Sequence, residues 1–319
     1  MKRVFLNYFR FHCNLFLKTV SLLTCFFVLT ACSYEKTPQE EKKKINFETS
    51  ILTKSCNKCG LSQNVLFESR DGIIDFVLWE SVINFDQLEK EKRKDEYLSD
   101  CEDKEKDFKF VGSADHSFEI DKKTGEIRRK IRIHADKDTI KKLSEKDLIG
   151  LSINKDGVLP LKENLDKLLK NDWKEVPTVS FKYKEKEKTS KITFGLKEDV
   201  PFRFFQANYI DGTSFSLADK NNIGMAAVNR EHTLEKIPEV DFYYTIIDES
   251  VLVSFTTFSM DKETLKAVSS SGAFPSMLEI KNETKEISIE DLRKHYKSLG
   301  WEEMTIQEDG KKIIRNKEI

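Results

Sequence analysis

The chain has 319 residues, of which 34% are charged, and its 54 Lys and Arg nearly balance its 55 Asp and Glu. The two signs are interspersed along the sequence, so the pattern lacks the basic face that a nucleic-acid-binding protein needs. The chain has 12 Gly and 6 Pro, too few for a fibrous repeat or a disordered chain. We therefore expect a folded protein that does not bind nucleic acid.

The first 31 residues have the layout of a secretory signal. Lys2, Arg3, Arg10 and Lys18 precede residues 19–31, an uncharged run of 13 residues rich in Leu, Phe and Val. As a helix, this run would cover roughly 20 Å, which is short of the roughly 30 Å hydrocarbon core of a bilayer. The pattern predicts a cleaved segment rather than a transmembrane anchor.

The uncharged run ends in Leu29-Thr30-Ala31-Cys32, which resembles the lipobox of a bacterial lipoprotein precursor. The resemblance implies that a peptidase cuts before Cys32, whose thiol carries a diacylglycerol and whose amino group is often acylated too. Two or three acyl chains would anchor the protein, since each buried methylene contributes about 0.8 kcal/mol. Ser33 rather than Asp follows, which in Gram-negative families implies delivery to the outer membrane. The alternative is an ordinary cleaved signal.

Cleavage before Cys32 would leave 50 Lys and Arg against 55 Asp and Glu, a net charge of −5. Residues 33–44 contain one aromatic residue, one Pro and no aliphatic side chain, so this segment cannot bury itself. We assign residues 32–50 to a flexible tether after the signal peptide at 1–31. The remaining residues suffice for two α+β domains, at 51–172 and 173–319, or for one large domain.

Strand patterns dominate the folded part. In residues 126–134 every even position is polar and three of the four odd positions are Ile, the pattern of a sheet with one face in water. Two alternating segments joined by the charged residues 184–190 indicate a hairpin. The expected strands after residue 170 lie at 179–183, 192–196, 202–210, 242–247 and 251–258, with a turn at 248–250.

The strand expected at 202–210 carries Phe202, Phe204, Phe205 and Tyr209, which occupy both of its faces. Either the strand is buried on both sides, or one aromatic face is exposed for a partner. We favour burial on both sides.

Two helices are expected. One follows Pro160, which suits a first-turn position, and places Leu161, Leu165, Leu168 and Leu169 on one face. The other begins at a capping box and ends before a glycine that fits the C′ position; these residues are Ser288, Asp291 and Gly300.

Residues 301–306 and 311–315 are predicted to form a closing hairpin around Asp309-Gly310. The expected fold is α+β, with mainly antiparallel β-sheets and a few covering helices.

After cleavage and lipidation, the chain keeps three cysteines that would enter an oxidising compartment, namely Cys56, Cys59 and Cys101. Cys56 and Cys59 have the CxxC spacing of thiol–disulfide oxidoreductases, in which a helix N-terminus lowers the pKa of the first thiol. No helix start follows here and no βαβ pattern precedes the motif. We expect a structural disulfide between Cys56 and Cys59 and a free Cys101. Pairing with Cys101, idle thiols, a redox role and a zinc site that adds His116 remain open.

No catalytic, cofactor-binding or metal motif is found elsewhere in the sequence. The four mature histidines lack metal-site spacing and are expected on the surface. They are His116, His134, His232 and His295. Residues 269–272 lack the context of a nucleophile elbow, and 219–224 lack the ligands of a calcium loop. We expect a polar loop and a turn there.

Two classes of function fit these patterns. The first is a non-enzymatic envelope lipoprotein that sits on the membrane through its acyl chains. It would bind an envelope protein or a cell-wall partner through a sheet face or edge, as an inhibitor, immunity factor or assembly accessory. The second is an enzyme, either a thiol–disulfide oxidoreductase using Cys56 and Cys59 or one with no recognisable motif. The missing catalytic motif favours the first class, with no cofactor.

Overall fold

The computed structural model describes residues 46–56, 60–84, 91–121, 124–237, 239–247, 251–272, 287–304, 307–308 and 311–312. Residues Ile45–Ile319 form one compact unit. The signal peptide, Cys32, most of the tether, Cys59 and the turn at 248–250 lie outside the described residues. Across the described ranges, no helix combines the length and the apolar character that a bilayer crossing requires.

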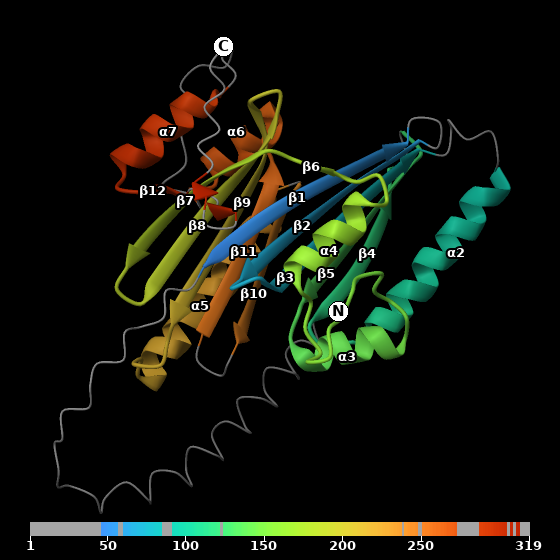
Figure 1. The fold of residues 1–319 in the computed structure, drawn as a ribbon, viewed down its shortest axis with the longest axis horizontal. Coiled ribbons are helices and arrows are strands. Elements are labelled where there is room, and N and C mark those ends of the chain that lie inside the picture. The colour runs from blue at the N-terminus through green and yellow to red at the C-terminus, as the bar shows by residue number, and fades with distance from the viewer. Residues whose placement is uncertain are drawn as a thin grey trace, which may run out of the picture. The chain divides into compact units, whose positions relative to one another are not determined.

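The fold is α+β and mainly antiparallel, as expected, with two six-stranded sheets (Figure 1). The first sheet has the order β4-β5-β3-β2-β1-β6 and the second β10-β11-β9-β8-β7-β12. The first contains β1 (Phe47–Cys56), β2 (Leu61–Arg70), β3 (Ile73–Asn84), β4 (Ala114–Ile120), β5 (Glu126–His134) and β6 (Lys174–Glu175). The second contains β7 (Thr178–Glu185), β8 (Lys188–Lys197), β9 (Val200–Asp211), β10 (Val240–Ile247), β11 (Val251–Ser259) and β12 (Glu302–Met304).

The described helices cover the outer faces of the sheets, with α2, α3 and α4 beside the first and α6 and α7 beside the second (Figure 1). They are α2 (Glu91–Phe108), α3 (Lys137–Glu145), α4 (Leu161–Leu169), α5 (Leu217–Leu234), α6 (Lys262–Ser270) and α7 (Ile289–Ser298). A separate pair of short strands, β13 (Gln307–Glu308) and β14 (Lys311–Lys312), flanks Asp309-Gly310.

Three hydrophobic cores hold these layers together. One lies between the first sheet and its helices, a second between the second sheet and its helices, and a third between the two sheets. Neighbouring residues of one strand therefore enter different cores. In β9, Phe204 packs on the helix side while Phe205 and Tyr209 pack between the sheets. The prediction that this strand is buried on both faces is confirmed.

Several expected elements are confirmed. β7 and β8 form the predicted hairpin, and β9, β10 and β11 match the predicted strands. Ser288 caps α7 in a capping box with Asp291, and Gly300 follows the helix with a φ of 81°.

Other expectations need correction. Pro160 is the N-cap of α4 rather than a first-turn residue, and Leu169 is 43% exposed. Asn164 is buried on the inner face of the helix instead. Its side-chain oxygen accepts a hydrogen bond from the Ser152 N–H, and its side-chain nitrogen donates one to the Ser152 carbonyl. The predicted antiparallel pair on either side of Asp309-Gly310 is present, between β13 and β14. Its first strand is Gln307–Glu308, because β12, inside the predicted range 301–306, pairs with β7 instead.

The tether is shorter than expected, and one predicted turn is a helix. β1 begins at Phe47, so the last four residues assigned to the tether belong to a strand. Residues 219–224 lie inside α5, where Ser216 and Asp219 form a capping box. Ser269 and Ser270, expected in a polar loop, are the last residues of α6.

Candidate functional site

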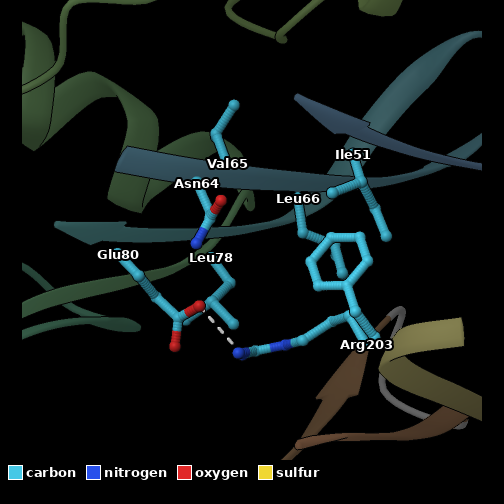
Figure 2. Close-up of a pocket in the computed structure, with 8 residues that line it drawn as sticks. Ile51, Asn64, Val65, Leu66, Leu78, Glu80 and Arg203 are labelled. Carbon is cyan, nitrogen blue, oxygen red and sulfur yellow. Dashed lines mark ion pairs between the residues drawn. The ribbon is translucent and has the colours of Figure 1, made fainter. Parts of the chain in front are cut away.

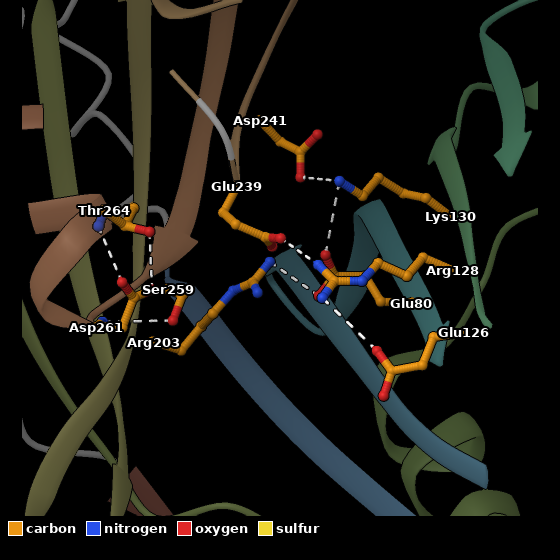
Figure 3. A network of polar contacts seen from close by, with 10 residues as sticks. All are labelled: Glu80, Glu126, Arg128, Lys130, Arg203, Glu239, Asp241, Ser259, Asp261 and Thr264. Atoms are coloured by element: carbon orange, nitrogen blue, oxygen red, sulfur yellow. Dashed lines mark hydrogen bonds and ion pairs between the residues drawn. The ribbon is translucent and has the colours of Figure 1, made fainter. Parts of the chain in front are cut away.

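The charged face of β5 is half-buried and turned toward the second sheet. Arg128 and Lys130 form ion pairs with Glu239, next to β10, and Asp241 of β10 (Figure 3). The prediction of a face in water holds only in part, because the side chains of Arg128 and Lys130 are 39% and 29% exposed. The alternation of polar and apolar residues in β5 does identify its two faces. It does not show whether water or the acidic side chains of a second sheet lie opposite the polar face.

We call this region the inter-sheet seam, defined by Glu80, Arg128, Lys130, Arg203 and Asp241. The Nζ of Lys130 lies 2.6 Å from Asp241 Oδ2 and 3.9 Å from Glu80 Oε1. The guanidinium of Arg203 on β9 lies 2.9 Å from Glu80 Oε2, so Glu80 of β3 connects the first sheet to one strand of the second. Most charged groups of the seam are therefore ion-paired with each other.

The hollows at the seam are small. One has a volume of about 20 Å³ and is lined by residues of both sheets, including Glu80, Leu78 and Arg203 (Figure 2). A second, beside Arg132 and Tyr243, has about 10 Å³. Each has room for about one water molecule, whereas small-molecule sites usually have hundreds of Å³. The seam is therefore a contact between two layers rather than a substrate pocket.

A second polar cluster is buried deeper between the sheets. Glu68 on β2 is 0% exposed and Lys191 on β8 is 1% exposed, and the Nζ of Lys191 lies 3.2 and 3.3 Å from the two carboxylate oxygens. Thr49 and Tyr209 donate their hydroxyls to the same carboxylate. Burial raises the pKa of Glu68 and lowers that of Lys191, although each partner opposes the change.

Cys56 is not followed by a helix start in the described residues. Cys56 is the last residue of β1 and Leu61 opens β2, so the first cysteine of the CxxC motif ends a strand instead of beginning a helix. Cys101 is a free, buried thiol on α2, and burial raises its pKa. Because Cys59 lies outside the described residues, its disulfide with Cys56 stays a prediction.

Two histidines predicted on the surface are buried. His116 and His134 are 3% and 5% exposed, whereas His232 is exposed and His295 is partly so. Within the described ranges, no three or more His, Cys, Asp and Glu side chains are grouped to hold a metal ion.

His116 packs under α2 as a neutral ring. Its Nε2 accepts a hydrogen bond of 2.7 Å from Arg129 Nε, and its ring lies 5.6 Å from that of Phe108. Burial, with the nearby Arg129 cation, lowers its pKa to about 4. The ring is therefore uncharged in the folded protein at neutral pH.

We expect this ring to make folding sensitive to acid. In the unfolded chain His116 becomes protonated below about pH 6.5, whereas in the folded chain it stays neutral down to about pH 4. The free energy of unfolding therefore decreases as the pH falls through this window. The loss amounts to at most about 3 kcal/mol at its lower end. His116→Gln should flatten the acid limb of a urea-unfolding series, and His232→Gln on exposed α5 should not. Equal slopes in both variants would contradict this role.

Helix α5 presents an uncharged face to solvent. Its exposed positions between residues 221 and 229 are Asn221, Asn222, Met225, Ala226 and Asn229. Met225 is 61% exposed, and Leu217, one turn before Asn221, is 47% exposed. On α2, by contrast, all but one of the exposed residues between 95 and 107 carry a charge. In a chain with 34% charged residues, an uncharged face of this length stands out as a contact surface.

The strand beside this helix lies at one end of the second sheet in the part of the chain that the structure describes. β10 is the terminal strand of the second sheet, and α5 packs against it. Proteins usually protect such edges with Lys, Pro or short length, but β10 has eight residues and contains neither Lys nor Pro. Its one charge, Asp241, is paired inward with Lys130. The other terminal strands are short, as β6 and β12 are, or carry exposed acids, as β4 does.

Sequence reasoning predicted the strand of this surface, at 242–247, but missed its helix. Residues 219–224 were interpreted as a turn after their match to a calcium loop failed. The capping pair Ser216 and Asp219 was the signal that could have identified the helix.

Comparison with known proteins adds no functional assignment. No family model matches the chain, and no curated protein matches it. The NMR structure of the E. coli YehR protein is similar with a TM-score of 0.35 at 16% identity, over 42% of this chain and 94% of that one. An NMR structure from Streptococcus pneumoniae TIGR4 is similar with a TM-score of 0.29 at 14% identity, over 46% of this chain and 94% of that one.

Proposed function

We propose that this chain is a lipid-anchored protein of the bacterial cell envelope that binds a protein partner and catalyses no reaction. The observation that carries the binding role is the uncharged face of α5 beside β10, the terminal strand of the second sheet in the described part of the chain. The lipobox ending at Cys32 supports the anchor, and Ser33 supports outer-membrane delivery if the bacterium is Gram-negative.

The chemistry of the surface favours a protein over a glycan as the partner. A terminal strand offers a row of backbone N–H and C=O groups that an added β-strand can pair with. The adjoining helix face offers amide and apolar side chains, which suit an uncharged protein surface and give a charged polymer no counter-charge. A partner that covers both would bury the open edge, as an inhibitor, immunity or assembly protein requires.

The seam supports a binding role in a different way. Its acidic and basic groups are engaged with each other across the sheets, and the hollows beside them hold about one water each. They fix the second sheet, and with it β10 and α5, against the first sheet.

Photo-crosslinking from α5 tests the binding role. A photo-reactive residue at Asn222 in the full chain, expressed in the native envelope, should give one discrete protein adduct. Met225→Glu in the same chain should reduce that adduct at least about fivefold, because a buried hot-spot contact is worth roughly 1–3 kcal/mol. Leu169→Glu, which places the same charge on exposed α4, is the matched control and should leave the adduct unchanged.

Two outcomes would contradict the proposal. One is the absence of any discrete adduct at Asn222 under conditions in which the protein is folded. The other is an adduct that responds equally to Met225→Glu and Leu169→Glu, which would point to a general charge effect. Because Met225 is 61% exposed, its substitution should alter stability by less than about 0.5 kcal/mol.

A further inference from the structure

The buried pair of Glu68 and Lys191 joins the two sheets through side chains that face each other with no solvent between them. Glu68 lies on β2 and Lys191 on β8, 123 residues apart in the chain, and both are essentially unexposed. The amine nitrogen is 3.2 and 3.3 Å from the two carboxylate oxygens. Since both oxygens are bonded to Cδ, the nitrogen also lies close to that carbon. The contact therefore places the amine directly against the carboxyl group with which it would react.

We propose that Glu68 and Lys191 form an amide cross-link between the two sheets after the chain has folded. This modification site is independent of the binding role proposed above. It needs no partner or cofactor.

The reaction balances within the pair. The Nζ lone pair of the neutral amine attacks Cδ of the protonated carboxyl group, and an N–C bond forms. The C–O bond to the hydroxyl then breaks, and the hydroxyl leaves with a proton from the amine as one water molecule. No electrons are gained or lost, so neither an oxidant nor a reductant is required.

The surroundings favour the neutral, reactive forms of both groups. Burial raises the pKa of Glu68 and lowers the pKa of Lys191, so it favours the neutral acid and the neutral amine, while the opposite charge of each partner acts against both changes. Hydroxyls of Thr49 and Tyr209 donate hydrogen bonds to the carboxyl oxygens and polarise the carbon. Thr193 in turn donates to Thr49 at 3.1 Å, so this donor is held in place from the second sheet. Fixed donors that stabilise a developing negative charge on oxygen are the usual aid to acyl transfer.

Peptide mapping of the purified full chain tests the proposal. After reduction and trypsin digestion, the linked chain should give a branched peptide that joins residues 59–70 to residues 189–197. Its mass should be the sum of the two peptides less one water. Cleavage after Lys191 should be missing, because trypsin does not cut at an acylated lysine.

The opposite result is equally clear. Separate peptides 59–70 and 192–197 in full yield would show a free Lys191 and would overturn the proposal without any variant. A double variant, Glu68→Leu with Lys191→Met, controls for the assignment and should give no branched peptide. If a branched peptide of the same mass persisted in that variant, the link would lie elsewhere and the proposal would fail.

Discussion

Lys191→Met is expected to lower the free energy of unfolding by about 3–5 kcal/mol, because it leaves Glu68 buried without a partner charge. Both side chains are at most 1% exposed, so water cannot replace the lost ammonium group. Urea unfolding followed by circular dichroism measures the loss. An amide between the two residues would act in the same direction, since a cross-link of distant strands restricts the unfolded chain.

Two comparisons separate this effect from a general loss of charge. Lys188→Met, at the exposed start of the same strand, should change stability by less than about 0.5 kcal/mol. Combining Lys191→Met with Glu68→Leu should recover much of the loss, because no buried charge then remains. A double variant as unstable as the single one would show that the unpaired carboxylate does not explain the loss, and would attribute it to packing or to the missing cross-link.

Cys32→Ala is expected to move the protein almost completely from the membrane fraction to the soluble fraction. The acyl chains that the lipobox resemblance implies are the anchor, and two or three of them bind far more strongly than one. Fractionation of cells that express the full chain measures the shift. Cys25→Ala, inside the apolar run, leaves Cys32 in place and should leave the protein on the membrane. If the Cys32→Ala protein stayed with the membrane, the anchor would have to be something else.

The fold class could be predicted because several strands alternate cleanly and pair with neighbours in sequence, as β7 and β8 do. β1, β2 and β3 were not predicted, since their side chains enter cores on both faces and the alternation is lost. In β2, for example, Leu66 packs between the sheets while Val65 and Phe67 pack on the helix side. A strand that is buried on both sides gives no period-two signal.

The candidate site was less accessible to sequence reasoning than the fold. Arg128 and Lys130 were recognised as one polar face, but only the structure places Glu239 and Asp241 opposite them. These pairs are 111 residues apart in the chain, and no local pattern encodes that separation. The same holds for Glu68 and Lys191, whose burial follows from the packing of two sheets.

Whether the protein is lipid-anchored can be measured directly from the intact mass of the mature chain after detergent extraction from membranes. We expect a polypeptide that begins at Cys32 and carries the added mass of a diacylglycerol, with or without a further acyl chain on its amino group. An unacylated chain, or one that begins at another residue, would contradict it.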